Sequence, residues 1–157
     1  MERVAIFVDV QNVYYTTRDA FGRHFDYHTF WARFAAGREV IMANAYAVER
    51  GDPRQQQFQA ILRGIGFTVK LKPFIQRSDG SAKGDWDVGI TLDAIEAGPL
   101  VDHLVLVSGD GDFDLLVSRL RERFGVRVTV VGVAPLTADS LVRAANDFVS
   151  VDASLLR

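Results

Sequence analysis

One stretch of the sequence limits the fold more than any other: residues 104–107 are apolar, and they are followed by Ser-Gly-Asp-Gly-Asp. The apolar run is typical of a buried β-strand. Gly109 and Gly111 predict a sharp backbone turn after it, because glycine adopts conformations that other residues avoid. Asp110 and Asp112 then lie where the strand gives way to a helix. In open α/β sheets, ligands bind beyond the carboxyl ends of strands. The two carboxylates therefore predict a cation site, although capping of the following helix is an equally simple interpretation of this stretch alone.

The rest of the chain alternates between strand and helix patterns. Continuous apolar runs predict buried strands, and apolar residues at helical spacing predict the helices between them. The expected strands are residues 4–8, 40–48, 67–71, 104–107 and 126–133, and a short extended segment over 147–151 is expected as an edge strand. The expected helices begin near residues 12, 26, 52, 85, 113 and 137. Such alternation indicates an α/β fold with a mostly parallel sheet that is covered by helices on both faces.

Composition narrows the classes of function. The 157 residues suit one domain, expected over 1–157. The absence of cysteine excludes disulfides, thiolate metal sites and a cysteine nucleophile. The first apolar run is too short for a secretion signal or a membrane span, which favours a cytoplasmic protein without membrane contact. A net charge of −2 argues against a general nucleic-acid coat, but it is compatible with an enzyme that holds phosphate through metal ions.

Three separate segments bring an acid to the end of a predicted element: Asp9, Asp87, and Asp110 with Asp112. If the first and fourth strands are neighbours, Asp9 and Asp110 are close, and the helix that opens near residue 85 can bring Asp87 to them. Such a group would have to become protonated or bind a cation. Mg²⁺ or Mn²⁺ fits an all-oxygen site. The chemistry that suits such a site is metal-assisted cleavage of a phosphodiester bond.

Other residues are expected to have lesser roles. Residues 72–84 are polar and rich in turn formers, and Arg77 and Lys83 there are candidates for phosphate contact, although a solvated loop is the simpler interpretation. Asp93 is rotated by about 120° from Asp87 on its helix, so a structural role is expected. His24 and His28 are four residues apart, but a predicted helix start separates them, so both are interpreted as structural or surface residues. The same interpretation applies to the remaining histidine, His103.

Three motifs together resemble the NYN domain, a branch of the PIN-like nuclease superfamily, and especially its bacterial LabA-like members. They are FVDVQN at 7–12, KGDWDVGITLD at 83–93 and SGDGDF at 108–113, in the family's order. The resemblance covers about residues 4–148. It implies a PIN-like three-layer α/β/α sandwich and a ribonuclease that uses Mg²⁺ or Mn²⁺ to cleave RNA.

The resemblance also implies roles for particular residues. The metal-binding acids would be Asp9, Asp87, Asp110 and Asp112. Asn12 would orient Asp9 or the substrate phosphate, and Ser108 would support the acids or the substrate through its hydroxyl. The family usually has one residue between the Lys-Gly pair and the acid that matches Asp87, whereas here there are two, so Asp85 could share or replace that role.

The resemblance leaves a second class of function open. LabA-like proteins are associated with regulation as well as RNA processing, so the chain could be a non-catalytic module that binds RNA or protein. The acidic net charge favours this alternative, whereas the full set of acids favours the enzyme. A homodimer could build a wider RNA groove than one domain of this size offers.

Overall fold

The structure is a computed structural model that describes residues 1–73, 75–76, 82–83 and 85–157, with backbone alone for 75–76 and 82–83. Within these residues, six strands form one sheet in the order β3-β2-β1-β6-β7-β8, and every neighbouring pair is parallel. A short antiparallel pair, β4 (Ile75–Gln76) and β5 (Ala82–Lys83), lies outside this sheet. The sheet strands are β1 (Arg3–Asp9), β2 (Glu39–Glu49), β3 (Thr68–Pro73), β6 (His103–Val107), β7 (Arg127–Gly132) and β8 (Asp147–Ser150).

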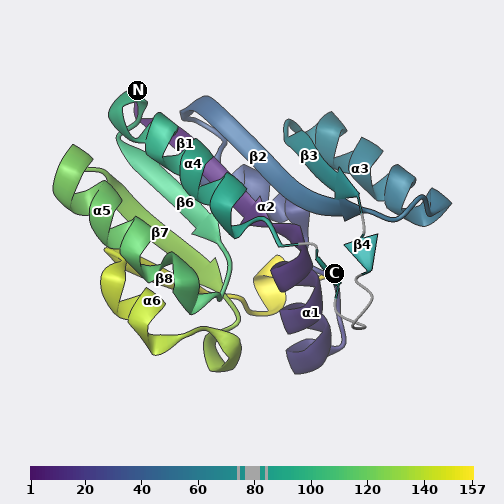
Figure 1. Ribbon diagram of the computed structural model, residues 1–157. Helices are drawn as coiled ribbons and strands as arrows, with labels where there is room; N and C mark the ends of the chain where they lie inside the picture. Colours follow the sequence, from purple (N-terminus) through teal and green to yellow (C-terminus); the bar gives the residue numbers. More distant parts are fainter. Residues whose placement is uncertain (74, 77–81, 84) are drawn as a thin grey trace.

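Helices cover both faces of the sheet, so the predicted three-layer α/β/α architecture is confirmed. One face is covered by α1 (Val10–Phe21), α2 (Tyr27–Phe34) and α3 (Pro53–Ile65). The other is covered by α4 (Asp87–Ala97), α5 (Asp114–Phe124) and α6 (Asp139–Ala144). Figure 1 shows α4 in front of the sheet and α2 behind it. No helix in the described part of the chain is long and apolar enough to cross a membrane.

The apolar runs form central strands because both of their faces are buried. In β1, Val4, Ile6 and Val8 pack into the core beneath α1, α2 and α3. The alternate residues, Ala5 and Phe7, pack into the core beneath α4, α5 and α6. All five side chains are fully buried. A strand between two helical layers has no solvent face, which explains a continuous apolar run where a half-exposed strand would alternate.

Several helices begin where the sequence predicts. The side chain of Asp26 accepts a hydrogen bond from the backbone N–H of Thr29 at 3.1 Å, and α2 follows. Asp52 caps α3 in the same way, and Pro53 occupies its first position. The last helix begins at Asp139, two residues later than expected. A short 3₁₀ turn, η3 (Ala134–Leu136), precedes it, and residue 137 has an extended backbone.

The order of the strands reverses between β1 and β6. From β1 the chain proceeds outward through β2 and β3, and from β6 it proceeds outward on the other side through β7 and β8. Val8 and Val107, near the carboxyl ends of β1 and β6, are register partners. The first and fourth predicted strands are therefore neighbours, and the residues that follow them meet at the point where ligands bind in open α/β sheets. The predicted segment at 147–151 forms β8, which lies at the edge of the sheet.

Candidate metal centre

The loop after β6 is shaped by close packing, which corrects the interpretation of its glycines from the sequence. Neither Gly109 nor Gly111 has a positive φ. A Cβ atom at Gly109 would lie 2.7 Å from the carbonyl oxygen of Leu136, and one at Gly111 would lie 2.8 Å from the Cβ of Ala138. Glycine is required at both positions because the segment between β7 and α6 packs against this loop.

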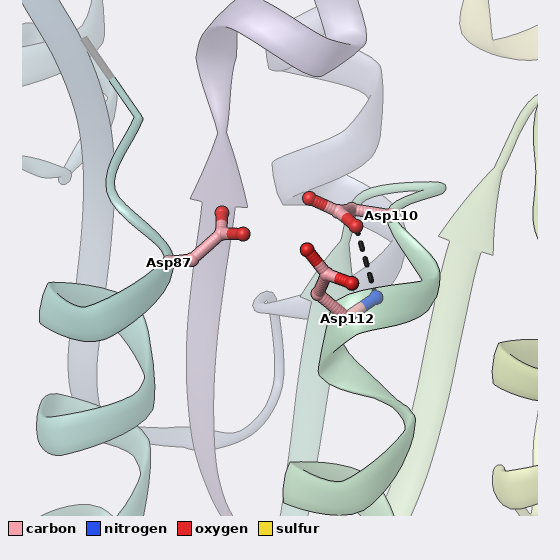
Figure 2. A group of neighbouring side chains, drawn as sticks. All are labelled: Asp87, Asp110 and Asp112. Atoms are coloured by element: carbon pink, nitrogen blue, oxygen red, sulfur yellow. Dashed lines mark hydrogen bonds between the residues drawn. The ribbon is translucent and has the colours of Figure 1, made fainter. Parts of the chain in front are cut away.

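Three carboxylates from two parts of the chain converge beyond the sheet. Asp87, Asp110 and Asp112 each place a carboxylate oxygen within 4.8 Å of the others, and we call this set the acidic cluster. Figure 2 shows Asp87 at the start of α4 pointing toward the other two, which belong to the loop and turn after β6. The backbone N–H of Asp112 donates to Oδ1 of Asp110 at 2.9 Å, which fixes that carboxylate at the start of the turn η2 (Gly111–Phe113).

The structure distinguishes the two acids that could occupy the start of α4. Asp85 accepts a hydrogen bond from the backbone N–H of Asp87 at 3.2 Å, in the turn that leads into the helix. Asp87 is the first residue of α4 and belongs to the acidic cluster, whereas Asp85 does not. The indole N–H of Trp86, between them, donates to the carbonyl of Ala47 at 2.9 Å. This bond ties the start of α4 to β2.

Asp9 lies beside the acidic cluster but outside it. Its carboxylate accepts hydrogen bonds from the backbone N–H of Asn12 at 3.4 Å and from the hydroxyl of Ser108 at 3.2 Å. The same Ser108 oxygen accepts from the backbone N–H of Asp110, also at 3.2 Å. The side-chain oxygen of Asn12 accepts from the backbone N–H of Gly109 at 2.9 Å. Asp9 is therefore connected to Asp110 through one hydroxyl, and Asn12 holds the loop between them.

Burial and repulsion between carboxylates raise the pKa of two of these acids, Asp9 and Asp87. Burial raises the pKa of Asp9 to about 6, and repulsion from Asp110 and Asp85 adds to the effect. Burial also raises the pKa of Asp87 to about 7, with repulsion from Asp110 as the next cause. The charges of Asp85 and Asp9 raise the pKa of Asp87 further. A bound cation would relieve this repulsion.

The donor set fits a hard divalent cation. Mg²⁺ takes oxygen ligands at about 2.1 Å, so ligands on opposite sides of the ion lie about 4.2 Å apart. Oxygens within 4.8 Å of one another can reach such a geometry through small side-chain rotations. Asp112 is exposed, so the acidic cluster is open to solvent and to a substrate.

Asp93 has the structural role that its helical position predicts. Its Oδ2 accepts hydrogen bonds from the hydroxyl of Tyr46 and from Nζ of Lys70, both at 2.7 Å. Asn44 donates to the same tyrosine hydroxyl at 3.0 Å. Tyr46 and Lys70 are register partners on β2 and β3, so the network joins α4 to two strands. The sequence gives no sign of this network, because its members are distant along the chain.

The predicted phosphate-binding residues lie largely outside the described structure. Arg77 lies outside the described residues, and Lys83 belongs to β5, where only the backbone is described. Lys72, from the same segment, donates from Nζ to the carbonyl of Asp85 at 3.1 Å. His103 is buried and bonded to the hydroxyl of Thr129 at 2.7 Å, as expected of a structural histidine. His24 and His28 are exposed.

Comparisons with known proteins agree on one family. The model of the NYN domain family matches residues 3–152. The chain is 31% identical over 158 residues to the "Low amplitude and bright protein LabA" of Synechococcus elongatus, covering 96% of this chain and 84% of that protein. It is also similar to a crystal structure of a protein of unknown function from Vibrio parahaemolyticus, with a TM-score of 0.95 and 58% identity over 99% of this chain and 96% of that one.

Proposed function

From the premise that this chain belongs to the NYN domain family, as its three motifs predict, we propose that it is a divalent-metal-dependent ribonuclease. The observation that carries the proposal is the acidic cluster at the carboxyl ends of β1 and β6. Its three acids would hold Mg²⁺ or Mn²⁺. These acids come from two separate parts of the chain. Capping of the helix after β6 would explain Asp110 or Asp112, but it would not explain why Asp87 lies beside them.

The chain's own residues supply positioning and proton transfer. When bound, a divalent ion would polarise a phosphoryl oxygen and lower the pKa of a water molecule. Asp110 and Asp112 would hold the ion from the rigid turn after β6, and Asp87 would approach from α4. Asp9 is the proposed fourth acid of the centre. It holds the loop through Ser108, and its carboxylate would accept a proton from the attacking water.

The proposed substrate is RNA, and its phosphate groups would lie at the acidic cluster. Asn12 would keep the loop in place for the substrate, and Ser108 would support the acids from beneath. Contact of Arg77 and Lys83 with the RNA backbone remains a proposal. The cytoplasmic location and the homodimer also remain predictions.

The test is cleavage of a single-stranded RNA in Mn²⁺ by the wild type and by Asp110→Asn. We expect the substitution to reduce the rate by at least about a hundredfold, because even residues that only orient metal ligands contribute ten- to a hundredfold. The fold should remain intact, as measured by circular dichroism. Asp19→Asn is the matched control, because it removes the same charge from an exposed ion pair with Arg18.

Three outcomes distinguish the alternatives. Full activity of Asp110→Asn, or cleavage that persists in a chelator, would refute the proposed centre. Equal losses in Asp110→Asn and Asp19→Asn would indicate a general effect of charge. A wild type that neither binds Mn²⁺ nor cleaves RNA would favour the non-catalytic module.

A further inference from the structure

A cavity of about 620 Å³ lies between α1, α2 and α3, beside the carboxyl end of β2, and we call it the helical cavity. Its lining includes Val10 and Gln11, the two residues that follow Asp9 in the chain. Its volume lies within the range of small-ligand sites. A larger cavity of about 740 Å³ lies at the opposite end of the sheet, near the amino ends of β7 and β8, and has no aromatic lining.

An aromatic platform forms one wall of the helical cavity. The rings of Tyr14 and His24 are stacked, with centroids 6.2 Å apart and an angle of 25° between their planes. Tyr14 is 47% exposed, and the ring of Tyr15 lies 5.4 Å from it, edge to face. The guanidinium of Arg18 lies over the Tyr14 ring, 5.5 Å from its centroid, and adds a positive charge beside the exposed part of the platform. The exposed part of the Tyr14–His24 pair is a surface of the kind on which single-stranded nucleic acids stack their bases.

Tyr27 brings an unused polar group to the same cavity. The residue is only 8% exposed, and its ring packs against Phe25 and Phe58 with centroids 5.0 and 5.5 Å away. Its hydroxyl forms no hydrogen bond with any other described residue, and the residue lines the cavity. Burial raises the pKa of Tyr27, and the charge of Asp9 raises it further, so the hydroxyl keeps its proton. A ligand in the cavity could satisfy it.

Arg54 and Gln11 also line the cavity. Arg54 lies at the start of α3, and its guanidinium forms no ion pair with any described residue. Gln11 follows Asp9 by two residues, and its amide has no hydrogen-bond partner within the described structure. The acidic cluster repels phosphate unless a metal is bound, whereas Arg54 attracts it. A ligand with an aromatic base and a phosphate matches this lining.

We propose that the helical cavity binds one unpaired nucleotide of an RNA strand, next to the phosphodiester bond at the acidic centre. The proposal rests on the proposed ribonuclease function. The base stacks on Tyr14 and His24, the phosphate pairs with Arg54, and Tyr27 and Gln11 form hydrogen bonds to the nucleotide. Only an unpaired nucleotide can leave its stack in this way, so the site selects single-stranded over duplex RNA.

The test measures the affinity of a fluorescein-labelled single-stranded RNA octamer by anisotropy, in Mg²⁺. The acidic cluster is left intact, and phosphorothioate linkages in the octamer prevent cleavage. Tyr14→Ala should weaken binding by about tenfold or more, because it removes a stacking surface, while Tyr14→Phe should leave binding unchanged. Arg54→Gln should weaken binding and reduce the slope of log affinity against log salt by about 0.7, the value for one single-strand phosphate.

Arg63→Gln is the matched control, because Arg63 is also exposed on α3 but does not line the cavity. Unchanged affinity in both Tyr14→Ala and Arg54→Gln, equal binding of duplex RNA, or no RNA binding at all would overturn the inference. If Tyr14→Ala alters the circular dichroism spectrum, His24→Ala replaces it, with the same expected loss. Weakened RNA binding in the cavity variants, together with a wild type that does not cleave RNA, would support the cavity and refute the ribonuclease.

Discussion

At the scale of single residues, three acids of the centre are each positioned by a different neighbour. Asp110 is held by the backbone of Asp112, and Asp9 by the hydroxyl of Ser108. The backbone of Asp87 is held by the carboxylate of Asp85, in the turn before α4. The sequence predicts the acids from their places at element ends, but it cannot predict the bond between Asp9 and Ser108, whose residues lie 99 positions apart.

The raised pKa values of Asp9 and Asp87 predict how stability depends on pH in the absence of metal. A carboxyl group whose pKa is higher in the folded chain stabilises the fold most at low pH, and this contribution is lost as pH rises through the folded-state pKa. The relevant window runs from the ordinary value of 3.8 to about 6 for Asp9 and about 7 for Asp87. We therefore expect the melting temperature in a chelator to fall as the pH rises from about 4 to about 7.

Asp87→Asn should reduce this fall, because it removes one titrating group and weakens the repulsion on the others. Thermal denaturation followed by circular dichroism at several pH values measures the effect. Asp19→Asn, which lies away from the cluster, should retain the wild-type dependence. An Asp87→Asn protein with the full wild-type dependence would show that the carboxylates do not interact in this way.

At the scale of elements, two loops depend on each other. The loop after β6 and the segment between β7 and α6 are in contact at Gly109, where a Cβ would lie 2.7 Å from a backbone oxygen. We expect Gly109→Ala to lower the free energy of unfolding by about 1–3 kcal/mol, as overpacking usually does. It should also displace Asp110 and weaken Mn²⁺ binding.

Gly64→Ala provides the comparison in urea denaturation. Gly64 lies inside α3, and a Cβ there would meet no heavy atom within 4 Å. Alanine should therefore stabilise the protein by about 0.5–1 kcal/mol, because it favours the helix over the unfolded chain. Equal stability of Gly109→Ala and the wild type would show that the two loops do not restrict each other.

Elements with strong local signals were predictable, and elements set by distant contacts were not. Asp52-Pro53 marks the start of α3 because both residues favour a helix start on their own. The delayed start of α6 depends on Thr137, which is buried and donates its hydroxyl to the carbonyl of Val133 at 2.8 Å. A Cβ at Gly132 would lie 2.5 Å from that hydroxyl. Such packing between segments leaves no periodic pattern in the sequence.

At the scale of the whole molecule, the order of the strands creates the centre. Three motifs far apart in the sequence meet because β1 and β6 are neighbours and α4 crosses the same face as α5. The alternation of strands and helices predicts the parallel sheet, but it does not predict which strands are adjacent. From the alternation alone, Asp9 and Asp110 are expected to be close only if the first and fourth strands are neighbours. The resemblance to the family implies that Asp9 and Asp110 belong to one group of acids, and in the structure the strands that precede them, β1 and β6, are neighbours.

The central claim is that the acidic cluster binds a divalent metal ion, and isothermal titration calorimetry with Mn²⁺ at neutral pH tests it most directly. The wild type and Asp19→Asn should bind with the same affinity. Asp110→Asn should show no binding, since it removes one of the three converging carboxylates while keeping the fold. Binding that is equal in all three proteins, or absent from the wild type, would contradict the claim.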